Sequence, residues 1–102
     1  MENKPGYSSI LSTRAQKEVA FSWEWYEERS LGLGERFLAE LIARIRDVEK
    51  DPDRFPTRYK NYKEAPLSTF PFLILYRVSS RKRSIRIVSV FHTARNPKRK
   101  YN

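Results

Sequence analysis

The chain has 102 residues, of which 39% are hydrophobic and 14% aromatic, enough for a single folded domain with one modest core. It has no cysteine and one histidine, which excludes disulfides and thiolate chemistry and argues against a structural zinc site. No stretch approaches the roughly 20 apolar residues of a membrane span, and the first residues lack the apolar run of a signal peptide. We therefore expect a cytoplasmic protein that needs no metal and no cofactor.

The positive charge of the chain is concentrated in its second half. The net charge is +9, but residues 1–49 carry a balance of −2 and residues 50–102 a balance of +11. A basic half on an otherwise neutral domain is the pattern expected for contact with a phosphate backbone or an acidic protein. The alternative is a solvated surface that only keeps the protein soluble.

The first half of the chain predicts one short strand and two helices. Residues 7–12 alternate in polarity like a strand. Thr13 is then the expected N-cap of a helix that runs to about Ser30, with Gln16 completing a capping-box pattern. After the break at "LGLG", a strong amphipathic helix is expected to end near residues 50–53, because its apolar residues recur every three to four positions. These apolar residues are Leu33, Phe37, Leu38, Leu41, Ile45 and Val48.

Three strand-like runs follow in the second half, at about 60–67, 72–78 and 84–92. A strand, two helices and three strands in this order predict an α+β fold (β-α-α-β-β-β), in which the N-terminal helical hairpin packs on one face of a mostly antiparallel sheet. We expect 1–102 to form one domain, with 98–102 as a flexible basic tail. One set of helical and alternate strand residues should be buried together: Leu38, Leu41, Ile45, Phe72, Ile74, Tyr76, Ile87 and Ser89.

The first predicted helix carries more aromatic residues than one face can bury. Phe21, Trp23 and Trp25 are two positions apart, so successive ones are separated by about 200° around the helix. At least one of them should point away from the core. Either these residues pack against the second helix, or they form a surface that binds a partner, a role in which tryptophan is common.

Several segments together resemble one known superfamily. They are "WYEERSLGLGERFLAELIARI", "DPDRFP", "LSTFPFLILYRV" and "IRIVSVFHTARNP". In order and spacing, across about residues 7–97, they are similar to the RelE/ParE superfamily of toxins, and in particular to its plasmid-stabilisation or ParE-like members. The resemblance implies the same element order and the toxin half of a type II toxin–antitoxin pair. It also implies a small cognate antitoxin, which we expect to bring an acidic, amphipathic segment to Phe21, Trp23 and Trp25.

The superfamily contains two mechanisms, and the resemblance leaves both open. ParE-like members bind DNA gyrase, whereas RelE-like members cut messenger RNA inside the ribosome without a metal. For such cleavage, Glu64 stands where some nuclease members place their base, and His92 and Arg95 stand where a general acid and a phosphate-holding cation are expected. Leu73, however, stands where the nuclease members carry an arginine, and Arg77 on the same side of that strand lies about 13 Å away. The departure at Leu73 favours gyrase binding; His92 with Arg95 favours the nuclease, unless His92 only packs at the strand end.

Basic residues of the second half are the expected contacts to the target or to nucleic acid. They are Lys60, Lys63, Arg81, Lys82, Arg83, Lys98, Arg99 and Lys100. DNA gyrase is the favoured target, and the ribosome with its messenger RNA is the alternative. A relic that binds an antitoxin but has little toxicity is also compatible with the sequence, and no contact with a membrane is expected.

Overall fold

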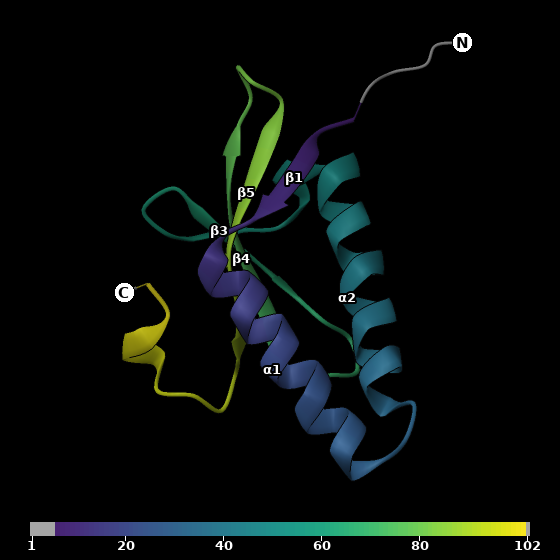
Figure 1. Cartoon of the computed structure of the whole chain (residues 1–102). Helices are drawn as coiled ribbons and strands as arrows, with labels where there is room; N and C mark the ends of the chain where they lie inside the picture. Colours follow the sequence, from purple (N-terminus) through teal and green to yellow (C-terminus); the bar gives the residue numbers. More distant parts are fainter. Residues whose placement is uncertain (1–5, 102) are drawn as a thin grey trace, which may run out of the picture.

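A computed structural model describes residues 6–101 and contains two helices packed against a five-stranded mixed sheet (Figure 1). In chain order the elements are β1 (Ser8–Leu11), α1 (Thr13–Arg29), α2 (Leu33–Lys50), the 3-10 turn η1 (Pro52–Arg54), β2 (Thr57–Tyr59), β3 (Tyr62–Pro66), β4 (Phe72–Ser79), β5 (Ser84–His92) and the 3-10 turn η2 (Pro97–Arg99). The predicted α+β fold is confirmed, with the short β2 as an additional strand. All three residues of β2 are exposed, so it lacks the alternation of polar and apolar positions that predicts a strand. No helix in the described part of the chain is long and apolar enough to cross a membrane.

The first strand joins the sheet differently from the others. The strand order is β1-β5-β4-β3-β2; β1 runs parallel to β5, and the remaining neighbours are antiparallel. Leu11, the last residue of β1, lies opposite Ile87 in the middle of β5. The second half of β5 therefore extends past the end of β1, and its free edge faces the start of α1.

Helix α1 begins one residue earlier than the sequence predicts. Its N-cap is Ser12, whose Oγ accepts a hydrogen bond from the N–H of the third helical residue (3.0 Å) and donates one to the Val88 carbonyl (2.9 Å). Thr13, predicted as the N-cap, is instead the first helical residue, because Ser12 is the hydroxyl residue that lies against β5. Gln16 takes no part in a capping box with Thr13; its Nε2 donates to the carbonyl of Leu11 (3.0 Å).

The core lies between the helices and one face of the sheet. Helix α2 contributes Phe37, Leu41 and Val48, which are at most 2% exposed, because they share the apolar side of the helix. The strand residues that belong to the same cluster are Ala65, Phe72, Ile74, Tyr76, Ile85, Ile87 and Val90. The predicted core residues Leu38 and Ile45 are only partly buried and pack against the margin of this cluster.

Ser89 departs from the predicted core pattern because β5 contains a β-bulge. The register between β4 and β5 shifts between Leu75 and Tyr76, which makes Val88 an extra residue in β5. Ile87 and Ser89 therefore do not lie on the same face of the sheet, although they are two positions apart. Ser89 is fully buried but lies outside the apolar cluster that contains Ile87.

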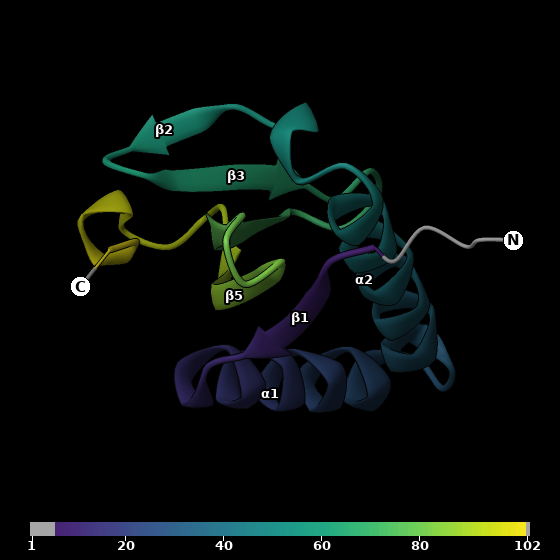
Figure 2. The ribbon, with the colours of Figure 1, turned by 90° about the horizontal axis from the view of Figure 1, so that it is seen from above.

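The two faces of the sheet are covered by different parts of the chain. The helices lie on one face, and the segment after β5 lies on the other (Figure 2). We name these the helix face and the tail face. The sequence predicts 98–102 as a flexible tail; of these residues, 98–101 pack against the tail face, and Asn102 lies outside the described residues. The turn η2 is followed by Lys100 and Tyr101, and both contact Glu64 of β3.

Candidate functional site

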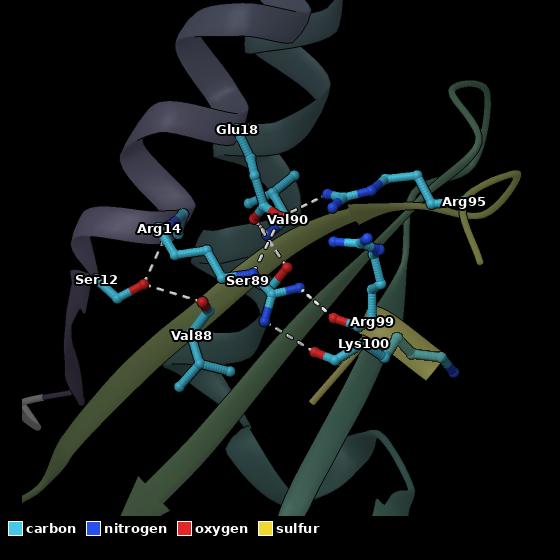
Figure 3. A network of polar contacts seen from close by, with 10 residues as sticks. Ser12, Arg14, Glu18, Val88, Ser89, Val90, Arg95, Arg99 and Lys100 are labelled. Atoms are coloured by element: carbon cyan, nitrogen blue, oxygen red, sulfur yellow. Dashed lines mark hydrogen bonds and ion pairs between the residues drawn. The ribbon is translucent and has the colours of Figure 1, made fainter. Parts of the chain in front are cut away.

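The carboxylate of Glu18 is the centre of a polar network where β5 extends past β1 (Figure 3). It accepts hydrogen bonds from the Ser89 hydroxyl (2.8 Å) and the Val90 N–H (2.9 Å) of β5. It also accepts from Arg14 Nε (3.2 Å) on its own helix and from the Arg95 guanidinium (3.0 Å) just beyond β5. A backbone N–H at an open strand edge needs a partner. Glu18 supplies one and thereby fastens α1 to the end of β5.

Arg14 connects the same network to the C-terminal segment. Its guanidinium donates to the carbonyl of Arg99 (2.7 Å) and to that of Lys100 (3.0 Å). Carbonyl groups at the end of a helical turn have no partner within the turn, so an arginine is a suitable donor to them. The start of α1, the end of β5 and the tail therefore form one connected unit.

An apolar hollow of about 460 Å³ lies beside this network on the helix face. Its apolar and aromatic lining comes from α1 and the sheet: Phe21, Trp25, Tyr26, Phe72, Val90 and His92. Its charged lining consists of Lys17, Arg95 and Glu18, and the Glu18 carboxylate is already paired with Arg95. We name this site the aromatic hollow. Its volume and lining suit an apolar side chain whose neighbours carry negative charge.

The three aromatic residues predicted to bind an antitoxin take different positions. Trp23 is half-buried, and its Nε1 donates to Glu35 of α2 (3.0 Å), which fits the packing role between the helices. Phe21 and Trp25 line the aromatic hollow and are still 69% and 43% exposed. The Arg29 guanidinium covers the Trp25 ring, 3.5 Å from its centroid. Phe21 and Trp25 are therefore the members of this set that remain open to a partner.

His92 packs against the sheet side of the aromatic hollow. Its ring is edge-on to Phe72, with the two centroids 4.9 Å apart, and its Nδ1 accepts a hydrogen bond from the Ala94 N–H (3.0 Å). These contacts fix the ring with one nitrogen occupied by backbone. The surroundings are those of a packing residue at a strand end, the role that the sequence left as an alternative to catalysis.

Glu64 is the centre of a second polar cluster, on the tail face. It is 8% exposed, and its carboxylate pairs with Lys100 Nζ (3.1 Å) and accepts a hydrogen bond from the Tyr101 hydroxyl. The Tyr101 ring is stacked on Tyr59, with centroids 4.4 Å apart, and lies 5.1 Å from Tyr62. Burial, and next the hydrogen bond to Glu64, raise the pKa of Tyr101 above its ordinary value of 10.0. The tail thus covers the carboxylate that the sequence singled out as a base.

The sheet separates Glu64 from His92. Glu64 points to the tail face, since its neighbour Ala65 belongs to the core, whereas His92 lines the aromatic hollow on the helix face. Arg95 lines the same hollow as His92 and is paired with Glu18. The structure therefore divides the residues that the sequence suggested for RNA cleavage: His92 and Arg95 line one hollow, whereas Glu64 lies on the other face of the sheet.

The strand positions of Leu73 and Arg77 follow the predicted alternation, and both lie on the tail face. Leu73 is half-buried opposite Phe91. Arg77 is exposed near the other end of β4, opposite Arg86, and its guanidinium carbon lies 5.6 Å from the centroid of Tyr62. Within residues 6–101 there is no group of three His, Cys, Asp or Glu side chains that could hold a metal ion.

The basic residues predicted to contact a target differ in their availability. Lys63 donates to the Thr57 hydroxyl (3.2 Å) and lies 3.8 Å from Asp53, and Lys100 pairs with Glu64, so both serve the fold. The exposed members are Lys60, Arg81, Lys82, Arg83, Lys98 and Arg99. Lys60 and Arg83 lie in the turns after β2 and before β5 with left-handed backbone (φ 50° and 49°), a conformation more usual for glycine or asparagine.

Glu18 and Arg14 are the structurally central residues that the sequence did not single out. Their spacing of four positions is that of an ion pair on a helix surface, and this much is visible in the sequence. The contacts of Glu18 with Ser89 and Val90, however, join residues 71 and 72 positions apart. They depend on β5 extending past β1, which no local pattern predicts.

Solved structures of bacterial toxins share this fold. The chain is similar to a structure of the chromosomal ParDE toxin–antitoxin system from P. aeruginosa, with a TM-score of 0.73 and 12% identity over 84% of this chain and 95% of that one. It is also similar to structures of the RelBE2 toxin–antitoxin complex from Mycobacterium tuberculosis (TM-score 0.62, 20% identity, 85% and 98% covered) and of the E. coli RelBE complex (0.62, 22%, 87% and 99%). At these identities the similarity defines the class of fold, that of the RelE/ParE-like toxins.

The sequence match is more specific than the fold. Residues 10–97 match the family described as "ParE toxin of type II toxin-antitoxin system, parDE". Because this range covers most of the chain, from within β1 to the start of η2, the protein belongs to the ParE toxin family, and the resemblance seen in the sequence is confirmed. Among curated proteins, none matches this chain.

Proposed function

We propose that this ParE-family toxin inhibits growth by binding DNA gyrase and that a cognate antitoxin neutralises it. The observation that supports binding over RNA cleavage is the separation of Glu64 and His92 by the sheet. A base for the ribose hydroxyl and an acid for the leaving oxygen must reach the same phosphodiester. Two residues on opposite faces of a sheet do not meet this requirement.

The partners of each suggested catalytic residue support the same proposal. Glu64 is occupied by Lys100 and Tyr101, and His92 accepts a backbone hydrogen bond on Nδ1. Arg95 is paired with Glu18. Each of these side chains thus has a structural partner in this fold, which is compatible with a toxin that acts by binding.

The aromatic hollow supports the antitoxin part of the proposal. Phe21 and Trp25 leave a large apolar area exposed, and Lys17 and Arg95 add positive charge to the same lining. An amphipathic antitoxin segment with an apolar side chain and adjacent carboxylates complements this site. The similar structures from Mycobacterium tuberculosis and E. coli are described as toxin–antitoxin complexes, which supports a partner of this kind.

The target is tested by adding purified full-length protein to gyrase and measuring DNA supercoiling, while messenger RNA cleavage is measured in a ribosome-containing lysate. We expect inhibited supercoiling and intact RNA. Reversal of charge at Arg81 and Lys82 (both to Glu) should weaken gyrase inhibition, whereas the same change at Arg36 and Arg46 on α2 is the matched control. All four residues are exposed. Equal effects of the two pairs, or intact gyrase activity with the unmodified protein, would reject the gyrase target.

A second candidate function, cleavage of messenger RNA, is favoured by one observation. Glu64, Lys100 and Tyr101 place a carboxylate, an ammonium and a phenol in contact on the tail face, with Arg77 on the same face. Such groups are able to move protons and hold phosphate. Under this candidate, Glu64→Gln abolishes RNA cleavage in the lysate while antitoxin binding is retained.

A further inference from the structure

Two arginines lie side by side on the tail face. Arg77 of β4 and Arg86 of β5 are directly opposite each other in the antiparallel ladder, and both are exposed. Within residues 6–101, neither guanidinium takes part in a hydrogen bond or an ion pair; Arg77 has only the Tyr62 ring as a close partner (5.6 Å). The carboxylate of Glu64 on this face is already occupied by Lys100 and Tyr101.

This pair does not help the fold. Side chains at directly opposite positions have Cβ atoms about 4.5–5.5 Å apart, and like charges there repel each other. A guanidinium does not relieve the repulsion by losing its proton. An anion that bridges Arg77 and Arg86 would remove the repulsion, so the pair is suited to bind a negatively charged partner.

The pair lines a hollow of the sheet that is partly open to solvent. Arg77 and Arg86 line a hollow of about 500 Å³ on the sheet, together with Asn61, Ser79, Lys82 and Ser84. We name it the basic hollow. The charged side chains of its lining are all cations, and its amide and hydroxyl groups add further hydrogen-bond donors. A ligand with several hydrogen-bond acceptors and two negatively charged groups fits this lining.

We infer that the basic hollow binds the phosphate backbone of a single-stranded nucleic acid. The fork of each guanidinium matches the two oxygens of a phosphate, and Lys82 adds a third positive charge. A strand fits better than an isolated phosphate because aromatic rings continue the site: Tyr62 lies next to Arg77, and Tyr59 beside it is 42% exposed. Cations that hold a backbone beside aromatic rings that stack bases are the usual elements of a single-strand site.

This binding goes beyond the proposed function, since it requires neither gyrase nor an antitoxin. The basic hollow is also distinct from the aromatic hollow, which lies on the helix face. The binding assay described next changes Arg77 and Arg86, which the gyrase assay leaves intact, so the two assays have separate outcomes.

The test measures binding of full-length protein to a short fluorescent oligothymidylate and to an oligouridylate by anisotropy, at low and at raised salt. The double variant Arg77→Gln, Arg86→Gln is compared with Arg36→Gln, Arg46→Gln, which removes the same charge from exposed positions of α2. We expect the first variant to lose at least about tenfold in affinity and the control far less. The salt slope should fall by about 1.4 in the first variant, because each lost phosphate contact on a single strand contributes about 0.7.

A conservative variant and a melting experiment distinguish a loss of binding from a loss of folding. Arg77→Lys with Arg86→Lys keeps both charges but loses the forks, so it should keep most of the salt slope and lose part of the affinity. Without oligonucleotide, the Gln variant should have a melting temperature equal to or above that of the unmodified protein, because the repulsion between the two arginines is gone. Adding the oligonucleotide should raise the melting temperature of the unmodified protein but not that of the Gln variant. Equal losses in the α2 control would show diffuse attraction and overturn the inference. It would equally be overturned if inorganic phosphate or oligoglutamate bound the hollow as tightly as the oligonucleotide.

Discussion

The two faces of the sheet are covered by contrasting interactions. On the helix face, α1 and α2 bury a continuous apolar core in which Phe37 and Val48 have no exposed surface. On the tail face, a short C-terminal segment is held by polar contacts and stacked rings, centred on Glu64 and Tyr101. Buried apolar area supplies most of the stability of a small domain, whereas a largely buried ion pair such as that of Glu64 and Lys100 gains little net free energy, because desolvation offsets the attraction. The helix face holds the larger apolar core, whereas the tail face buries Leu75 and Phe91 and also carries exposed cations.

This contrast also bears on the proposed mechanism. Glu64, His92 and Arg95 are the residues expected of a nuclease, and they occur in suitable order along the chain. The sheet places Glu64 on the tail face and His92 on the helix face, where each has a local structural partner. A nuclease needs both groups on one face, so the division of the faces argues for a toxin that acts by binding.

The largest expected effect is the loss of a core side chain on the helix face. Leu41 is 2% exposed, so Leu41→Ala should lower the free energy of unfolding by about 2–5 kcal/mol through lost burial and a residual cavity. The adjacent Ile42 is 41% exposed, and Ile42→Ala should cost much less. Urea denaturation of both variants measures the difference. Similar losses for the two positions would mean that α2 does not present the proposed face to the sheet.

The next effect concerns the aromatic hollow. Phe21→Ala should weaken binding of the cognate antitoxin by about 2 kcal/mol, or roughly 30-fold, if Phe21 is a central anchor of the interface. Leu31→Ala is the control, because Leu31 is 93% exposed and lies outside this hollow. Titration calorimetry with the purified antitoxin gives both affinities. A loss that is no greater for Phe21 than for Leu31 would place the antitoxin elsewhere.

A smaller effect is expected where α1 is fastened to β5. Ser12→Ala should reduce the free energy of unfolding by about 1 kcal/mol, because it removes the N-cap of α1. Thr13→Ala, one residue later, should have little effect, since Thr13 does not cap the helix. Thermal unfolding of the two variants decides between the positions. A larger loss for Thr13 would restore the cap predicted from the sequence.

The smallest effect is a pH dependence on the tail face. The pKa of Tyr101 is raised in the folded protein above its ordinary value of 10.0. Above that pH the unfolded chain therefore releases the proton first, so the contribution of Tyr101 to stability is intact below pH 10.0 and is lost as the pH rises further. Tyr101→Phe should make the decline in stability at alkaline pH shallower. Denaturation curves on both sides of that pH test this; an unchanged decline in Tyr101→Phe would contradict it.

The sequence predicts this fold well where the signal is periodic. The apolar spacing from Leu33 to Val48 gives α2 almost to the residue, and the two long apolar runs give β4 and β5. The predictions are wrong where the chain does not follow a regular apolar pattern. The extra residue at Val88 shifts Ser89 away from the predicted core pattern, and a three-residue strand such as β2 is too short to show alternation.

The candidate site is less predictable, because it depends on contacts between distant segments. The sequence identifies Phe21 and Trp25 as surplus aromatics, since that argument needs only helical geometry. It does not identify Glu18, whose partners on β5 depend on where β1 ends. Nor does it predict that Glu64 and His92 lie on opposite faces of the sheet. Alternation shows which residues of one strand share a face, but it does not show which face of one strand matches which face of another.

The central claim, inhibition by binding and not by catalysis, is tested most directly with the His92→Ala variant. Purified unmodified protein and this variant are assayed side by side for inhibition of gyrase supercoiling and for messenger RNA cleavage in a ribosome-containing lysate, with thermal unfolding as the control for folding. The account predicts that both proteins inhibit gyrase and that neither cleaves RNA. Cleavage by the unmodified protein that disappears in His92→Ala, with the melting temperature unchanged, would contradict it.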